Sequence, residues 1–446
     1  MNEVIMGIIN SPPINAGNLR KELSRMNMVD IGDIFGELTK EQTIQFFRLL
    51  PKDIAANVFA YIETDKQQII VEALTDNEVG KIVGGLFADD AVDFIEEMPA
   101  NVVNRVLRSI PAEKRKIINQ LLQYPDDSVG SMMTTEYMTL REDFNIIETF
   151  SEIRNKKIKG LHTCYVVRRD KLLVGTVSLK TLLLAKEHER IADIMHPNVI
   201  SANTTDDQEH AARLFRKYGL LSLPVVDKEG RMVGIITVDD AVEIVEEETT
   251  EDFEKMAAIL PSEDPYLKTG VFKHTYKRVG WLLVLMLAAI LTEMIIADVE
   301  DLLAVLPALS AFIPMLMDSG GNAGAQTSML VIRSMALDEI KFKDILKVWW
   351  LEIRVAVICG LVLGVVNAAR VLIFNPERAL LTLVVAITLL AVMVLSKSLG
   401  CLLPLTAKKI NLDPAALAMP IVKTLADVVA LLVYFAVAAA LLPELR

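Results

Sequence analysis

Residues 415–442 read AALAMPIVKTLADVVALLVYFAVAAALL, and this stretch decides how the rest of the chain is interpreted. It is long enough to cross a bilayer as a helix, which takes about 20 residues. It nevertheless carries Asp427 near its middle and Lys423 one helical turn earlier. A charge at the bilayer centre costs at least ~2.5–3.5 kcal/mol on insertion scales, so such a residue usually faces a partner or a water-filled path. Two interpretations stay open: Asp427 lines a cation path, or Lys423 and Asp427 neutralise each other inside a helix bundle.

Four more apolar stretches precede this one, near residues 279–297, 302–332, 353–374 and 379–403. The sequence therefore predicts an all-α membrane domain of five helices over residues 279–446. Basic residues gather in two alternate connections: Arg333, Lys341, Lys343, Lys347, Lys408 and Lys409. Because basic loops stay inside, we expect a multi-pass protein of the cell membrane with a cytoplasmic N-terminus and its C-terminus outside. The start of the chain, MNEVIMGIINSPP, lacks the features of a signal peptide, which agrees with that orientation.

Charge separates a soluble part from the membrane part. Residues 252–446 hold 17 acidic and 17 basic residues, so the whole net charge of −12 lies in residues 1–251. An acidic soluble part argues against nucleic acid as a partner and is compatible with cation binding, although ordinary solubility explains it equally well. The three cysteines lack metal-ligand spacing and fit a reducing compartment. Without a nucleophile–base pair or a GxxxxGK[ST] loop, the sequence does not predict an enzyme.

Residues 1–128 show short helical patterns punctuated by Pro51, Pro99 and Pro111. LLPKDIAANVFAYI, EEMPANVVNRVL and SIPAEKRKIINQLL are loose variants of one unit. We expect an all-α superhelical domain of stacked helix pairs with a regulatory role.

One acidic segment stands out in this domain, ADDAVDFIEE at residues 88–97. On a helix, Asp89, Asp93 and either Glu96 or Glu97 share one face, where like charges destabilise the helix slightly. A divalent cation would relieve that repulsion. The alternative is an acidic helix N-terminus favoured by the helix dipole.

Residues 129–193 and 194–250 repeat one α+β unit. The segment VVRRDKLLVGTVS at 166–178 recurs as VVDKEGRMVGIIT at 225–237, a β-hairpin that leads into a helix with its glycines in register. Together with Met133 and Met195 near the starts, each copy resembles a CBS (cystathionine-β-synthase-type) domain. That resemblance implies a tandem pair that binds adenine nucleotides or serves as a dimer interface.

The second copy carries Thr237-Val238-Asp239-Asp240, which matches the hydroxyl-x-x-acid pattern of CBS domains. The resemblance places Thr237 and Asp240 near the phosphate and ribose of a nucleotide such as ATP, and a carboxylate is suited to accept bonds from ribose hydroxyls. The first copy has Thr181 where Asp240 falls, so a site there is doubtful. A helix cap is the alternative role for Thr237 and Asp240.

An acidic run, EEETTEDFE at residues 246–254, is expected to continue the helix that leaves the second CBS unit. Residues 251–278 are then expected to form a connecting helix that links the soluble and membrane parts mechanically.

The second apolar stretch contains PMLMDSGGNAGAQTS at residues 314–328. Small residues let helices approach closely, and amide side chains bond across them. The same amides could present oxygens to a hydrated cation, so packing and a path both remain open.

The order of these parts resembles the MgtE family of magnesium transporters over nearly the whole chain. The specific motifs are Pro314 with GGNAGAQ at 320–326, LDPA at 412–415 and LAD at 425–427. The resemblance implies a homodimer in the lipid bilayer with one magnesium path near the two-fold axis. Asp427 would be the pore carboxylate, Asp413 would attract cations at the cytoplasmic end, and the residues beside the pore would be Gly321, Asn322, Gln326 and Lys423.

The resemblance also implies feedback. Cytoplasmic Mg²⁺ would bridge carboxylates of the N-terminal and CBS domains and close the pore, through residues drawn from Asp89, Asp93, Glu247, Asp252 and Glu254. Magnesium would enter down its electrochemical gradient. Lys423 departs from the family pattern, which usually has a small or neutral residue there. The alternatives are another divalent cargo, Co²⁺ or Mn²⁺, or a membrane-anchored CBS nucleotide sensor that transports nothing.

Overall fold

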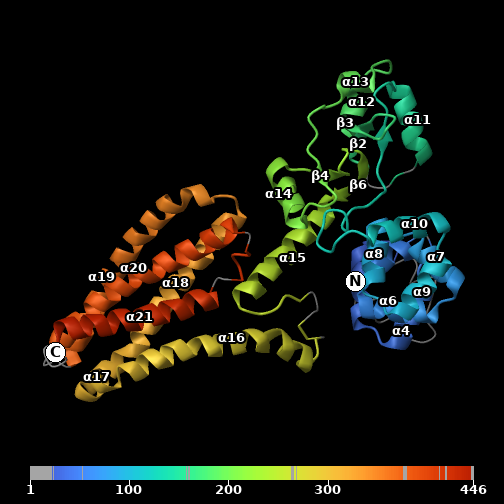
Figure 1. Ribbon diagram of the computed structural model, residues 1–446. Helices are drawn as coiled ribbons and strands as arrows, with labels where there is room; N and C mark the ends of the chain where they lie inside the picture. Colours follow the sequence, from blue (N-terminus) through green and yellow to red (C-terminus); the bar gives the residue numbers. More distant parts are fainter. Residues whose placement is uncertain are drawn as a thin grey trace. The chain divides into compact units, whose positions relative to one another are not determined.

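The computed structural model describes residues 23, 25–52, 54–156, 158, 161–262, 266–267, 269–374, 379–410, 412–416 and 419–442. The chain divides into two compact units, Met1–Val245 and Glu246–Arg446 (Figure 1). Each unit is described by itself.

The first unit opens with short helices, as the proline-punctuated pattern predicts. They are α3 (Met28–Ile34), α4 (Lys40–Leu49), α5 (Ala55–Ala60), α6 (Thr64–Ala73), α7 (Asp76–Val83), α8 (Ala88–Glu96), α9 (Ala100–Ser109) and α10 (Ala112–Leu121), with a 3₁₀ turn at Phe35–Glu37. Pro99 and Pro111 stand directly before α9 and α10. Aromatic rings fill the core between the helices; those of Phe59 and Phe94, for example, lie 5.3 Å apart. The all-α prediction for this region is confirmed.

Two three-stranded sheets follow. The first has β1 (Thr139–Leu140), β2 (Thr163–Val167) and β3 (Leu173–Ser178), and the second has β4 (Ala202–Asn203), β5 (Ser222–Val226) and β6 (Met232–Thr237). Their helices are α11 (Ile146–Lys156), α12 (Leu179–Leu184), α13 (Ile191–Ile194), α14 (Gln208–Tyr218) and α15 (Val238–Met256). In both sheets the outer pair of strands is parallel and the hairpin is antiparallel.

The two repeats exchange their opening segments. A Cβ on Gly234 of the second copy would lie 2.5 Å from the sulfur of Met133, which opens the first copy. A Cβ on Gly175 of the first copy would lie 2.6 Å from the sulfur of Met195, which opens the second. The glycines in register are therefore required by methionines from the other repeat, and this contact joins the pair.

The second unit is helical. It contains α16 (Val271–Asp298), α17 (Glu300–Val305), a 3₁₀ segment Pro307–Phe312, α18 (Ile313–Ala336), a 3₁₀ turn Phe342–Asp344, α19 (Ile345–Phe374), α20 (Ala379–Lys409) and α21 (Met419–Leu441). Figure 1 shows α18, α20 and α21 lying close together in the orange-to-red part of the chain. Among the residues that the structure describes, four helical segments are long and apolar enough to cross a membrane: Val271–Asp298, Phe342–Ile373, Leu380–Lys409 and Met419–Leu441.

Two predicted elements differ from the structure. The expected span at 302–332 is not one helix, because Pro307 has no N–H for the helix ladder and the chain leaves helical geometry at Leu306. Most of that span is α18, which is not among the four helices that are apolar enough to cross a membrane because it carries several polar residues. The expected connecting helix at 251–278 is also divided, since α15 ends at Met256 and α16 begins at Val271. The acidic run does continue the helix that follows the second hairpin, as expected.

Candidate functional site

Asp427 lies near the middle of α21 and faces a cavity of about 400 Å³ between helices of the second unit. The cavity is lined by Ala289, Thr292, Glu293, Ile296, Met317, Thr424 and Asp427. Among the described residues, no hydrogen-bond partner reaches the buried Oδ1 of Asp427. This oxygen is buried beside Gly321, and the Asp427 residue as a whole forms part of the cavity wall.

Glu293 on α16 also lines this cavity, although it was not predicted from the sequence. The signal was present, because Glu293 interrupts an apolar stretch as Asp427 does. The cavity thus gathers two carboxylates and the hydroxyl of Thr424 from helices that are far apart in sequence.

A second polar feature follows α18. Asp318, Asn322 and Gln326 are exposed and lie four residues apart, so they occupy one face of the helix. Asn322 donates from Nδ2 to Asp318 Oδ2 at 3.0 Å. We call these three residues the polar stripe. Because lipid cannot satisfy such groups, this face of α18 requires water, an ion or another protein surface.

Lys423 lies against the polar stripe. Its Nζ is 3.9 Å from Asp318 Oδ1. The structure therefore shows a partner for Lys423 that the sequence did not suggest, since the two open alternatives for this lysine concerned Asp427.

Two glycines of α18 lie against different neighbours, one against apolar and backbone atoms and one against charged side chains. A Cβ on Gly324 would lie 2.9 Å from Val422 Cγ1 and 3.0 Å from the carbonyl oxygen of Ser396, so this glycine is required for close helix contact. A Cβ on Gly321 would instead lie 2.8 Å from Lys423 Cγ and 3.2 Å from Asp427 Oδ1. Gly321 is thus the glycine that lets the charged face of α21 approach α18.

Asp413 is already engaged at the start of the last helical segment. Its Oδ1 accepts a hydrogen bond from the Ala415 N–H at 2.8 Å, and its Oδ2 pairs with Lys255 Nζ at 2.9 Å. Lys255 also pairs with Glu251 at 2.7 Å. Burial alone would lower the pKa of Lys255, but the hydrogen bonds and charges of Glu251 and Asp413 outweigh burial and raise it. In this structure Asp413 therefore serves as a tie to α15.

The three acids selected from the acidic run lie on α15. Glu247 is exposed and Asp252 is partly buried. Glu254 accepts a hydrogen bond from the Ser262 N–H at 2.7 Å, which stabilises the turn that follows the helix. The role of these residues in cation binding stays a prediction.

The first unit holds a larger acidic pocket of about 780 Å³. We call it the acidic pocket, and its acidic lining residues are Glu63, Asp89, Asp90, Asp93, Glu97, Glu136, Asp239, Asp240 and Glu243. The acids at positions 63 to 97 belong to the helical region, Glu136 belongs to the first repeat, and the last three lie on α15. None of the described lining residues is a lysine or an arginine.

Burial and mutual repulsion perturb the carboxylates of the acidic pocket. Burial, followed by the charges of Asp240 and Asp90, raises the pKa of Asp89 to about 8. Burial and the charges of Asp90 and Glu243 raise that of Asp93 to about 8. Asp89 Oδ1 is buried and has no hydrogen-bond partner among the described residues. The ionised carboxylates of the pocket therefore repel one another, and a bound cation would reduce that repulsion.

Direct coordination is not preassembled in the acidic pocket. Across the residues that the structure describes, no three His, Cys, Asp or Glu side chains are arranged closely enough to hold a metal ion. Magnesium dehydrates reluctantly and is usually held by one or two carboxylates and several waters. The pocket has the charge and the volume for a hydrated cation of that kind.

Thr237 and Asp240 form a helix cap at the start of α15. Asp240 Oδ2 accepts hydrogen bonds from the Thr237 N–H at 3.1 Å and from its hydroxyl at 2.6 Å. Burial raises the pKa of Asp240 to about 6, although the Thr237 hydrogen bonds oppose the rise. Both residues also line the acidic pocket, where the phosphates of a nucleotide would meet many carboxylates. These hydrogen bonds fit the cap role, and the nucleotide role of the two residues stays a prediction.

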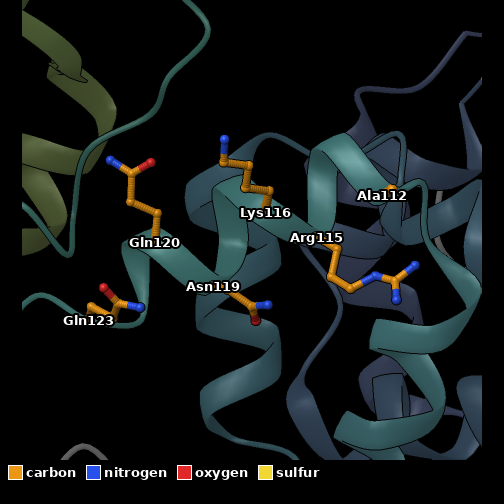
Figure 2. A pocket seen from close by; sticks show the side chains of 6 residues that line it. All are labelled: Ala112, Arg115, Lys116, Asn119, Gln120 and Gln123. Carbon is orange, nitrogen blue, oxygen red and sulfur yellow. The ribbon is translucent and has the colours of Figure 1, made fainter.

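A hollow of different character lies on α10 (Figure 2). It has a volume of about 560 Å³ and is lined by Ala112, Arg115, Lys116, Asn119, Gln120 and Gln123. Its charged lining side chains are basic, and Figure 2 shows them projecting from a single helix. No second element supplies a lining residue, so we assign it no function.

Comparison with known proteins covers both units. Family models match residues 26–127 (MgtE intracellular N domain), residues 129–188 and 191–247 (CBS domain), and residues 313–437 (MgtE, divalent cation transporter). The "Magnesium transporter MgtE" of Thermus thermophilus is 35% identical over 324 residues, which are 72% of each chain.

Two solved structures resemble the first unit. The soluble part of a magnesium transporter superposes with a TM-score of 0.52 at 24% identity, covering 55% of this chain and 97% of that one, and it shows the same fold. The cytosolic domain of the Mg²⁺ channel MgtE in complex with ATP is 33% identical, with a TM-score of 0.48, and covers 51% of this chain and 93% of that one.

Proposed function

Because the chain belongs to the MgtE family of divalent cation transporters, we propose that it conducts Mg²⁺ across the membrane along the face formed by α18 and α21. It is a membrane protein with helices able to span a bilayer, and it is not an enzyme. Asp427 would be the main carboxylate of the path. Asn322 and Gln326 would supply amide oxygens beside it, where Gly321 leaves room.

One observation carries this proposal: the polar stripe is exposed on a helix of the membrane part. Asp318, Asn322 and Gln326 cannot face hydrocarbon without a large cost. Asp427 lies near this face with an oxygen that lacks a hydrogen-bond partner among the described residues. A water-filled cation path satisfies all four side chains at once.

The same stripe supports a homodimer. A single chain supplies a wall of the path but leaves its polar face open. A second copy related by a two-fold axis would place a matching stripe opposite the first, because symmetric interfaces are self-complementary. Two Asp427 carboxylates would then face one hydrated ion.

The acidic pocket supports regulation by the transported ion. Cytoplasmic Mg²⁺ bound between α8 and α15 would hold the helical region against the CBS pair and favour a closed state by differential binding. Asp89 and Asp93 on one side and Asp240 and Glu243 on the other would share the ion. Glu247, Asp252 and Glu254 are further candidates along α15.

The direction of transport follows from physical chemistry. The sequence shows no nucleotide-hydrolysis loop, so flux would run down the electrochemical gradient. An inside-negative potential favours entry of a divalent cation. We place the first unit and the basic connections in the cytoplasm and the C-terminus outside.

A nucleotide role at the acidic pocket would depend on a bound cation. ATP is bound by the cytosolic domain of the related channel named above. Here Asp240 Oδ2 accepts the hydrogen bonds from Thr237, and the pocket is acidic. If ATP binds at this pocket, it would bind as its Mg²⁺ complex, because the cation would offset the repulsion between phosphates and carboxylates.

The test is Mg²⁺ flux into proteoliposomes under an imposed gradient. We expect uptake by the wild type and its loss in Asp427→Asn. The matched control is Asp338→Asn, since Asp338 lies in the turn after α18 with a φ of 58° that asparagine also adopts. Uptake of Co²⁺ or Mn²⁺ in place of Mg²⁺ would overturn the cargo. A folded protein that passes no divalent cation, even with internal Mg²⁺ held low, would favour the CBS sensor alternative.

A further inference from the structure

The side chain of Lys423 occupies the face along which the proposed path runs. We propose that Lys423 is a tethered counter-ion: its ammonium occupies the position beside Asp318 that a permeating cation would take, and so lowers the affinity of the path for divalent cations. This inference rests on the proposed function, since it assigns a specificity-determining residue to the same path.

The stem of Lys423 is held in place by α18. A Cβ on Gly321 would lie 2.8 Å from Lys423 Cγ and 3.3 Å from its Cε, so the stem packs directly over this glycine. The absence of a side chain at Gly321 therefore leaves room for the lysine stem. The direction of the side chain is set by packing as well as by charge.

The charged end is held by Asp318. Lys423 Nζ lies 3.9 Å from Asp318 Oδ1, while Asp318 Oδ2 accepts the hydrogen bond from Asn322. The ammonium thus joins the polar stripe. Asp427 lies one turn further along α21 and keeps an oxygen with no hydrogen-bond partner among the described residues. Lys423 Nζ is thus placed beside Asp318, while Asp427 lines the cavity described above.

The ammonium is loosely enough held to be displaced. The side chain of Lys423 is 49% exposed and that of Asp318 is 68% exposed, so the pair is not locked in the interior. An ion pair of this length and exposure contributes little stability. A divalent cation that enters the path can therefore replace the ammonium at Asp318, and the lysine can swing aside on its flexible stem.

The electrostatic consequence has a definite sign. With Lys423 beside them, Asp318 and Asp427 present one net negative charge per chain in place of two. A divalent ion is attracted less, and it must also displace or approach a like charge. The half-saturating Mg²⁺ concentration for flux is raised, while release of the ion is made easier.

A purely structural tie between α18 and α21 is the competing explanation. It predicts that loss of the lysine destabilises the protein and leaves the ion dependence of flux unchanged. A tethered counter-ion predicts a change in half-saturation at nearly unchanged stability. Measuring the half-saturating Mg²⁺ concentration and the thermal stability of the same variants separates the two.

The experiment measures Mg²⁺ flux against external Mg²⁺ for the wild type, Lys423→Met, Lys423→Gln and Lys423→Arg, with Lys343→Met as a control on an exposed lysine of the α18–α19 connection. Both neutral variants should lower the half-saturating concentration by about tenfold or more. Lys423→Arg and the control should stay near the wild type. In Asp318→Asn the lysine loses its partner, so the half-saturating Mg²⁺ concentration should rise above that of the wild type. In the double variant Asp318→Asn with Lys423→Met it should not rise.

The outcomes are distinguishable from failure of the proposed function. If the wild type carries Mg²⁺ and Asp427→Asn does not, but the neutral Lys423 variants keep wild-type half-saturation, the counter-ion role is wrong and the path stands. Loss of flux in folded Lys423→Met and Lys423→Gln would also overturn it, because the lysine would then be required. If no variant and no wild type carries a divalent cation, the path itself fails.

Discussion

Glu352 on α19 and Lys397 on α20 form an ion pair inside the helical unit, with 3.5 Å between Oε2 and Nζ. Thr327 on α18 joins them: its hydroxyl donates to Glu352 Oε2 at 2.9 Å and accepts from Lys397 Nζ at 3.0 Å. The side chains of Lys397 and Glu352 are only 9% and 14% exposed. Three helices are therefore joined by one buried charged network.

Removing one partner of this pair should destabilise the membrane part strongly. Lys397→Met leaves Glu352 buried without its counter-charge, which costs about 3–5 kcal/mol for buried pairs. The double variant Lys397→Met with Glu352→Gln should recover most of that loss, because no uncompensated charge remains. Thermal unfolding in detergent would measure both. Additive losses in the double variant would contradict a coupled pair.

The contact between Gly400 on α20 and Gly324 on α18 should tolerate no side chain. A Cβ on Gly400 would overlap the backbone carbonyl of Gly324, so Gly400→Ala must push the helices apart. We expect a loss of about 1–3 kcal/mol, typical of overpacking. Gly364→Ala is the control, because its Cβ would meet Ala386 at an ordinary 3.7 Å. Equal stability of the two variants would show that α18 and α20 do not approach as described.

The acidic pocket should make the folded state less stable as pH rises, and bound Mg²⁺ should offset that loss. The pKa of Asp89 and of Asp93 is about 8 in the folded chain and near 3.8 when the chain is unfolded. The stabilising effect of these protons is fully present below pH 4 and is lost as pH rises through 8. Without Mg²⁺, the Tm for unfolding of the first unit should fall as pH rises from 6 to 8.5.

Mg²⁺ should raise that Tm more at pH 8.5 than at pH 6, because it binds the ionised carboxylates. In Asp93→Asn both the pH dependence and the Mg²⁺ effect should shrink. Asp33→Asn, on the exposed face of α3, is the matched control. A Tm that responds to Mg²⁺ equally at both pH values in wild type and Asp93→Asn would exclude this pocket as the binding site.

The tie between Lys255 and Asp413 should couple α15 to the segment before α21. Lys255→Met breaks a pair that is about one-third exposed, so the loss should be small, about 0.5–1 kcal/mol. Inhibition of flux by internal Mg²⁺ should weaken by about twofold to fivefold. The exchanged pair Lys255→Asp with Asp413→Lys should restore inhibition. If Lys255→Met leaves the inhibition curve unchanged, the tie is local and does not transmit regulation.

Several elements of the fold could be predicted because they depend on local pattern. Alternation of apolar residues marked the two hairpins, and Pro99 and Pro111 marked helix starts that the structure confirms. The span over 302–332 was predicted incorrectly at its N-terminal end, because average hydropathy does not register the break at Leu306 and Pro307. Hydropathy alone also does not place α18 among the spans, since α18 carries several polar residues.

The candidate site could be predicted only in part. Asp427, Asn322 and Gly321 were selected from sequence and lie near one another. Glu293 and Asp318 were not selected, although each is an acid in an apolar segment. Asp413 pairs with Lys255, a partner that was not predicted, and its expected role in attracting cations stays a prediction.

The sequence by itself determined which segments are apolar, where charge interrupts them and which units repeat, because these properties belong to residues close along the chain. Only the tertiary structure decided the partners. Lys423 could pair with Asp427 four residues away or with Asp318 more than a hundred residues away, and both pairings are compatible with the sequence. At the close approach of α18 and α21 beside Gly321, the structure places Lys423 Nζ 3.9 Å from Asp318 Oδ1. Likewise Asp89 and Asp240 become one acidic pocket only because folding brings α8 and α15 together, and burial then changes their charge.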